Sequence, residues 1–329
     1  MHWIWEVSAE PTRWYGAWQA AGGRSLLRDQ VSHEDLSCFE EIDRSLPAEA
    51  REAWWSDWIA EGASRSATDL SPSSWSRWLS PSINFQSLID RIEPNWSPRD
   101  SEATERQLEL RSRPIREFWD GYGRALVRQV ERRAGCSVGD RPVNICLLMP
   151  HNGGGGWAAM APFLARIDQP HLADRIAWEA MLTNPNPRLP ELLRLLWLGI
   201  QPSLWRQGVQ SVLHPQTLQD PRLPRGWLHL LAAAMVPLVL EAGEALELTG
   251  QPEELLEPAL AAWWPPAWEI PSNPGDRSPE EPASGQQASG KLADLVRGFW
   301  DRKSPGDWIA CCQGMLAESQ PGWQPPSGW

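Results

Sequence analysis

The chain contains very few lysines, tyrosines and phenylalanines. It has two lysines, two tyrosines and five phenylalanines in 329 residues, against 23 tryptophans and 31 prolines, and arginine supplies 28 of its 30 basic residues. The rare residues have A/T-rich codons and the abundant ones have G/C-rich codons, so genome composition accounts for the bias without selection for binding. We therefore interpret most tryptophans as ordinary core and boundary residues. The alternative is an indole surface that stacks against sugars, bases or a partner.

The cysteine pattern and the first residues exclude several classes of protein. The five cysteines are odd in number and never occur as C-x-x-C, so neither a zinc ribbon nor a disulfide framework is indicated. No basic region precedes an apolar stretch at the start, and Glu6 comes too early for a secretory signal. We expect a reducing, cytoplasmic location, no metal ion and no cofactor.

Charge and hydropathy limit the partners. A formal net charge of -12 repels phosphate backbones, so we do not expect nucleic-acid binding. The longest apolar run, residues 227–240, is shorter than the roughly 20 residues of a spanning helix and predicts a buried core helix. Arginines at 116, 124, 128 and 132 alternate with acidic residues, which is typical of a solvated helix face.

Apolar periodicity predicts a mainly α fold with a minor β component. Candidate strands lie near residues 2–7 and 143–149, where apolar residues alternate or form a short run. One helix is expected from Pro98 towards Leu110 and a second from Pro114, since proline suits a first helical position. Gln201-Pro202 is expected to be a break. The further expected helices are 157–167, 172–182, 189–200 and 227–248, the last kinked at Pro237.

Composition divides the chain into three parts. Residues 1–270 are expected to form the main helical domain. Residues 271–290 are rich in proline, glycine and serine and have nothing to bury, which predicts a flexible linker. Residues 291–329 are expected to form a small helical appendage ending in a Trp/Pro-rich segment. In it Leu292, Leu295, Phe299 and Trp300 form one amphipathic set.

A glycine-rich loop is the sharpest local feature. It lies between the candidate strand 143–149 and the helix expected from Trp157, where converging backbone N–H groups and the positive helix end suit an anionic group. A demanding turn where helix and strand approach closely is the alternative. The hypothetical ligand-binding residues are His151, Asn152, Gly153, Gly154, Gly155, Gly156 and Trp157.

No complete catalytic motif is present. The glycines are not followed by Lys-Ser/Thr, their spacing is not G-x-G-x-x-G, and G-x-S-x-G occurs nowhere. The catalytic residues are therefore unknown. An ionisable site would require the fold to bring together some of His151, Asp174, Glu179 and His229.

These observations favour a non-catalytic protein-interaction or scaffold protein, or a subunit of a larger assembly. The alternative is an enzyme or small-ligand binder that holds an anionic group on Gly153–Gly156, with His151 adjacent. The indoles expected to contact a protein partner are Trp263, Trp264, Trp268, Trp323 and Trp329.

Overall fold

We describe the protein from a computed structural model. The residues that it describes are 1–21, 37, 59, 98–149, 155–158, 174–180, 188–212, 231–263, 293, 294, 296–298 and 300. The chain divides into two compact units. The sheet unit comprises residues 2–114 and 141–183, and the helical unit comprises Met1 and residues 115–140 and 184–329. The predicted linker 271–290 lies outside the described residues.

Helices dominate, and a small mixed sheet accompanies them, as the sequence predicted. The helices are α1 (Ala9–Ala21), α6 (Pro98–Ala134), α8 (Glu191–Val212), α11 (Val236–Glu244) and α12 (Pro252–Trp263). Among the residues described, no helix combines the length and apolar character needed to cross a membrane.

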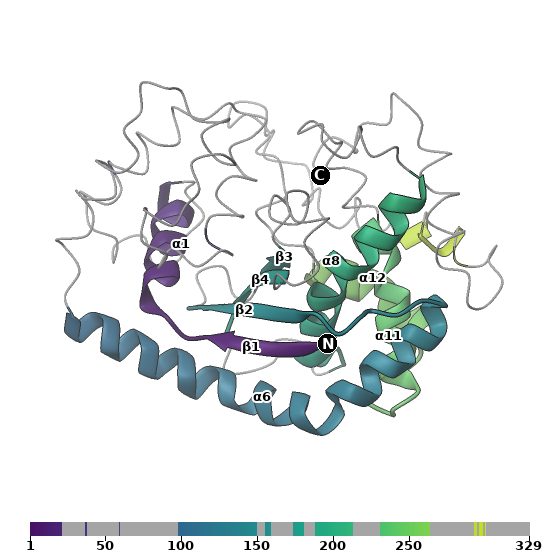
Figure 1. The fold of residues 1–329 in the computed structure, drawn as a ribbon, viewed down its shortest axis with the longest axis horizontal. Helices are drawn as coiled ribbons and strands as arrows, with labels where there is room; N and C mark the ends of the chain where they lie inside the picture. Colours follow the sequence, from purple (N-terminus) through teal and green to yellow (C-terminus); the bar gives the residue numbers. More distant parts are fainter. Residues whose placement is uncertain are drawn as a thin grey trace, which may run out of the picture. The chain divides into compact units, whose positions relative to one another are not determined.

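The sheet has four strands in the order β1-β2-β4-β3. Strands β1 (His2–Glu6), β2 (Pro142–Leu148) and β4 (Asp174–Glu179) run parallel, and β3 (Gly156–Ala158) is antiparallel to β4. Figure 1 shows β1 and β2 side by side, although more than 130 residues separate them in the chain. The strands expected near 2–7 and 143–149 are confirmed as β1 and β2.

Helices were predicted over 157–167 and 172–182, but Trp157 and Ala158 belong to β3 and residues 174–179 form β4. Residues 159–167, 172, 173, 181 and 182 of these predictions lie outside the described residues. Every residue of β4 is buried, because this strand lies between β2 and β3 and has both faces covered. Such a strand shows no polar and apolar alternation, and its short apolar run cannot be distinguished from a helix by periodicity.

Helix α1 packs on the sheet through aromatic contacts. The Tyr15 and Trp18 rings lie 5.5 and 6.1 Å from that of Trp157 in β3. The backbone N–H of Met149, just after β2, donates to Thr12 Oγ1 at 3.1 Å. At the start of α1, the Ala9 N–H donates to Glu105 Oε1 of α6 at 3.4 Å.

Helix α6 is continuous, which corrects the expected division into two helices at Pro114. Proline has no N–H, so the carbonyl of Leu110 loses its intrahelical donor, at a cost of about 3 kcal/mol. Both residues are exposed, and water can hydrogen-bond to the freed carbonyl. The two units divide directly after this proline.

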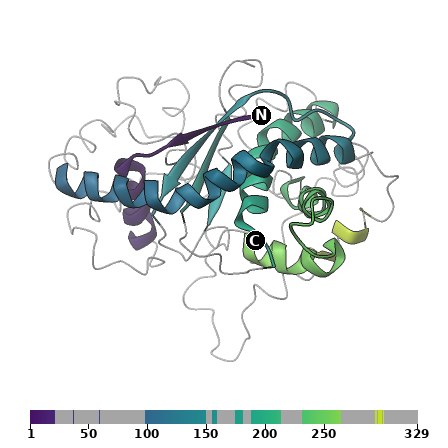
Figure 2. The same ribbon diagram turned by 90° about the horizontal axis from the view of Figure 1, so that it is seen from below.

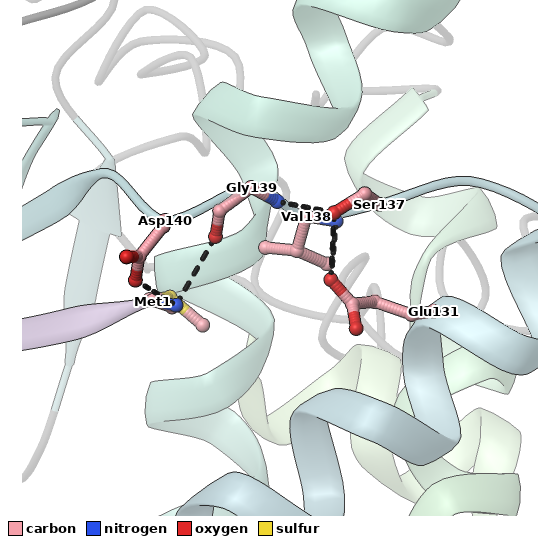
Figure 3. A network of polar contacts seen from close by, with 6 residues as sticks. All are labelled: Met1, Glu131, Ser137, Val138, Gly139 and Asp140. Atoms are coloured by element: carbon pink, nitrogen blue, oxygen red, sulfur yellow. Dashed lines mark hydrogen bonds and ion pairs between the residues drawn. The ribbon is translucent and has the colours of Figure 1, made fainter.

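The segment after α6 is held by a network of polar contacts (Figure 3). Gly135 ends the helix with a φ of 68°, which favours glycine. Glu131 Oε1 accepts hydrogen bonds of 2.9 Å from both Ser137 Oγ and the Val138 N–H. The Met1 nitrogen donates to the Gly139 carbonyl at 3.1 Å and lies 3.4 Å from Asp140 Oδ1.

Helix α8 forms the core of the helical unit. All residues from Leu192 to Arg206 are buried, and the helix continues through Pro202, where the sequence predicted a break. The lost hydrogen bond costs about 3 kcal/mol, whereas each fully buried leucine contributes about 1.5–3 kcal/mol, so burial outweighs the proline. Near Pro237 a new helix, α11, begins at Val236.

Most of the described indoles belong to the core. Seven tryptophans are buried, namely Trp3, Trp14, Trp157, Trp178, Trp197, Trp205 and Trp263. Four are half-buried, namely Trp5, Trp18, Trp119 and Trp300, and none in the described part of the chain is fully exposed. The interpretation of the tryptophans as core and boundary residues is confirmed for these eleven.

Candidate functional site

Strand register assigns the side chains of the sheet to two faces. Paired residues share a face, and successive residues alternate. Trp3 and Trp5 lie on the same face as Trp178, and the Trp5 and Trp178 rings are 6.5 Å apart. This face is mainly apolar. The opposite face carries Trp157 and is the one on which α1 packs.

The face under α1 carries a row of polar side chains. We call Glu6, Asn144, Cys146 and Arg175 the polar row, since Glu6 is paired with Cys146 and Asn144 with Arg175. Asn144 Nδ2 donates to Glu6 Oε1 at 2.6 Å. The row runs from half-buried Glu6 and Asn144 to buried Cys146 and Arg175, which are 1% and 4% exposed. It is therefore open towards β1 and closed towards β4.

The Cys146 thiol is held in its neutral form. Burial raises its pKa well above the ordinary value of 9.0, the Glu6 carboxylate raises it further, and Arg175 opposes both. A thiol with a raised pKa is a poor nucleophile, because the thiolate is the reactive species. The polar row is thus unsuited to cysteine-based catalysis, and its thiol acts as a small, weakly polar side chain.

The Asn144 amide leaves a hydrogen-bonding position open. Its Oδ1 atom is buried and has no hydrogen-bond donor among the described residues, while its Nδ2 donates to Glu6. Ile4 is paired with Asn144 on the same face and is 40% exposed. An unfilled acceptor, a carboxylate and an accessible apolar side chain therefore lie together at the open end of the polar row.

Further polar groups lie at the carboxyl ends of the parallel strands. Glu179 ends β4 and is fully buried, and its N–H donates to the Gly155 carbonyl at 2.7 Å. Thr12, also buried, accepts from Met149 just beyond β2. The carboxyl edge of a parallel sheet is where α/β proteins bind their ligands, and Glu6 ends β1 at this edge.

The predicted glycine-loop site is described only at its end. Gly155, Gly156 and Trp157 are buried, and Trp157 is in β3. The loop therefore leads into a strand and not into the helix expected from Trp157, so no helix dipole starts there. His151, Asn152, Gly153 and Gly154 lie outside the described residues, and their hypothetical role stays a prediction.

Asp174 and Glu179, two of the four ionisable residues that the sequence suggested as a possible site, do not lie close together. Asp174 and Glu179 are five residues apart in β4, which places them on opposite faces and about 16 Å apart along the strand. Asp174 instead lies 3.5 Å from Arg141, oxygen to nitrogen. His151 and His229 are outside the described residues.

Trp263, predicted to contact a protein partner, is only 2% exposed in α12, and its ring centroid is 5.8 Å from that of Trp197. Trp264, Trp268, Trp323 and Trp329 are not among the described residues, so their proposed role stays a prediction.

Sequence reasoning missed the polar row. Its members come from three strands, and β4 was expected to be helical, so the pairing of Asn144 with Arg175 could not be anticipated. One signal was present: Asn144 and Cys146 are the two polar or thiol-bearing positions of an otherwise apolar strand, two residues apart and therefore on one face.

Within the described ranges, no group of three or more histidine, cysteine, aspartate or glutamate side chains could hold a metal ion. Comparison of the chain with protein-family models, curated proteins and solved structures gave no match. The site must therefore be interpreted from its own chemistry.

Proposed function

We propose that the sheet unit binds a small molecule at the open end of the polar row, through an N–H donor attached to an apolar body. The observation that supports this proposal is the buried Oδ1 of Asn144, for which the described part of the chain supplies no donor although the amide lies beside the Glu6 carboxylate. An unfilled buried acceptor costs about 1–3 kcal/mol, and a ligand donor that reaches it recovers that free energy.

The neighbouring groups define the ligand class. Glu6 accepts hydrogen bonds and attracts positive charge, and exposed Ile4 supplies apolar surface on the same face. An amine or amide on an aromatic or aliphatic body matches both features. A carboxylate does not, because Glu6 repels it. The polar row thus favours a cationic or neutral N–H donor, in contrast to the anion predicted for Gly153–Gly156.

Three probes with the same aromatic body test the ligand class: benzylamine, benzamide and benzoate. At ten times the Kd, a ligand stabilises the folded state by about 1.4 kcal/mol, equivalent to a rise of about 3–5 °C in Tm. We expect this rise with benzylamine and benzamide and none with benzoate, measured by differential scanning fluorimetry of the full chain.

Two variants locate the binding. Asn144→Ala removes the open acceptor and should abolish the rise in Tm. Glu102→Ala removes an exposed carboxylate of the same unit on α6 and should leave the rise unchanged. Circular dichroism verifies that both variants fold. An equal response of the wild type and Asn144→Ala, or stabilisation by all three probes, would contradict a site at the polar row.

Protein interaction is the second candidate function. The helical unit supports it, because it binds a short helical segment from the C-terminal part of the chain through the Trp300–Glu241 contact. We further propose a reducing, cytoplasmic location. Among the described cysteines, Cys146 is a buried thiol outside any disulfide, which fits such a compartment. Fractionation of cells that express a tagged chain tests the location.

A further inference from the structure

A short helical segment from the C-terminal part of the chain lies against α11, another helix of the same unit. Residues 293, 294, 296–298 and 300 are helical, and Figures 1 and 2 show this yellow-green turn beside the green helices. Ala293 and Val296 are 0% and 1% exposed, and Trp300 is half-buried. These three residues are spaced i, i+3 and i+7, so one face of the segment contacts the unit.

The opposite face of the segment is solvated. Asp294 and Arg297 form an i,i+3 ion pair of 3.1 Å, with side chains that are 78% and 39% exposed. The described residues of the segment are therefore amphipathic, with Ala293 and Val296 buried and the Trp300 indole half-buried.

Glu241 of α11 is the polar centre of the docking surface. Its Oε1 accepts the Trp300 Nε1–H at 2.8 Å, and its Oε2 accepts the Arg133 Nε–H of α6 at 2.8 Å. Arg133 thus orients the carboxylate that binds the indole. We call Glu241 and Arg133 the receptor pair. A carboxylate acceptor makes the indole hydrogen bond stronger than one between neutral groups.

The segment is joined to the rest of the unit by a long connection. About 30 residues separate it from Trp263, the end of α12, and a chain of that length spans at most roughly 100 Å. Short helices are marginal in water without tertiary contacts, so the burial of Ala293 and Val296 contributes to the stability of the segment. Covalent connectivity therefore does not restrict the segment to the receptor pair of its own copy.

We propose that the receptor pair also binds residues 293–300 of a second copy of this chain, which produces an exchanged dimer. Exchange re-forms the same contacts between two copies, so it costs little beyond the loss of the intramolecular connection. A connection of about 30 residues corresponds to an effective concentration of roughly the millimolar range. The intramolecular arrangement therefore dominates at micromolar protein, and the dimer fraction rises as the protein concentration approaches the millimolar range.

Two full-length variants test the exchange when mixed. Glu241→Ala has an intact segment and a defective receptor, while Trp300→Ala has the reverse. Neither can dock its own segment fully, but the segment of Glu241→Ala fits the receptor of Trp300→Ala. At about 100 μM we expect at least tenfold more dimer in the mixture than in either variant alone, measured by sedimentation velocity.

Further variants keep the test decisive. Glu241→Gln with Trp300→Phe repeats the experiment with side-chain size retained, in case alanine disturbs folding. Asp294→Ala, which changes only the solvated face, should behave as the wild type. The proposal is overturned if folded variants stay monomeric when mixed. It is equally overturned if each variant dimerises alone as much as the mixture, or if the segment recruits only a different protein.

Discussion

Gly243 of α11 lies so close to Leu193 of α8 that an added β-carbon would be 2.6 Å from Leu193 Cδ1. The same β-carbon would be 2.9 Å from Thr249 Cγ2. Leu193 is fully buried within a helix that is buried on all sides, so it has little room to move. The contact between α8 and α11 therefore requires glycine at this position.

Gly243→Ala should destabilise the protein. Overpacking costs about 1–3 kcal/mol, and the better helix propensity of alanine recovers about 1 kcal/mol, so we expect a net loss of up to about 2 kcal/mol. The matched control is Gly121→Ala in α6, where a β-carbon meets nothing within 4 Å. That variant should gain about 1 kcal/mol. Urea unfolding measures both, and equal effects would contradict the close contact.

Glu247→Gly should stabilise the end of α11. Glu247 has a φ of 56°, a conformation that costs a residue with a side chain about 1–2 kcal/mol. Glycine removes that strain, but its greater conformational entropy in the unfolded chain offsets part of the gain. We therefore expect a net stabilisation of about 0.5–1 kcal/mol. Glu257→Gly, within α12, should have the opposite sign. Calorimetry of the two variants checks the difference, and a loss of stability in Glu247→Gly would disprove it.

Glu131→Ala should loosen the segment that follows α6. It removes the acceptor of both Ser137 and the Val138 N–H, and an unpaired N–H beside buried Val138 costs about 1–3 kcal/mol. Glu131→Gln keeps an acceptor oxygen and should lose less. Hydrogen exchange of the Val138 amide is the most direct measurement. Its protection should fall roughly tenfold or more in Glu131→Ala, and unchanged protection would rule out this role.

Cys146 should make stability fall at alkaline pH. Burial and Glu6 raise the pKa of the folded thiol above 9.0, whereas the unfolded thiol ionises near its ordinary value. Below that value the thiol is protonated in both states and its contribution is constant. Above it only the unfolded state loses the proton, so unfolding becomes easier by up to about 1.4 kcal/mol per pH unit.

A cysteine-to-alanine comparison isolates this pH dependence. Cys146→Ala should unfold with a flatter pH dependence than the wild type between about pH 9 and pH 10.5. Guanidinium unfolding at several pH values gives both slopes. Identical slopes for wild type and Cys146→Ala would show that the thiol is not protected as described.

The sequence predicted the elements that carry a local pattern. Strands β1 and β2 and the helical character of α6 and α8 were recognisable from periodicity, and the buried indoles from compositional bias. The prolines at 114 and 202 were misjudged, because local propensity takes no account of solvent at Leu110 or of the burial that surrounds α8. Strand β4 was misassigned because both of its faces are covered.

Sequence patterns could not predict the candidate site, because its residues are brought together by strand pairing. The polar row exists only because Glu6, Asn144 and Arg175 become neighbours through strand pairing, and pairing depends on register rather than on spacing in the chain. The docking of Trp300 on Glu241 is likewise a contact between segments about 60 residues apart. The sequence indicated the amphipathic segment but not the carboxylate that receives it.

The pairing of β1 with β2 affects how this protein is made. β1 ends at Glu6, and its partner is complete only at Leu148. A ribosome that adds about 5–20 residues per second needs roughly 7–28 s to cover that interval. During this time the indoles of β1 have no strand to pair with, and any nascent chain released before Leu148 exposes them. Pairing of β1 with β2 is therefore a late step in the formation of the sheet during synthesis.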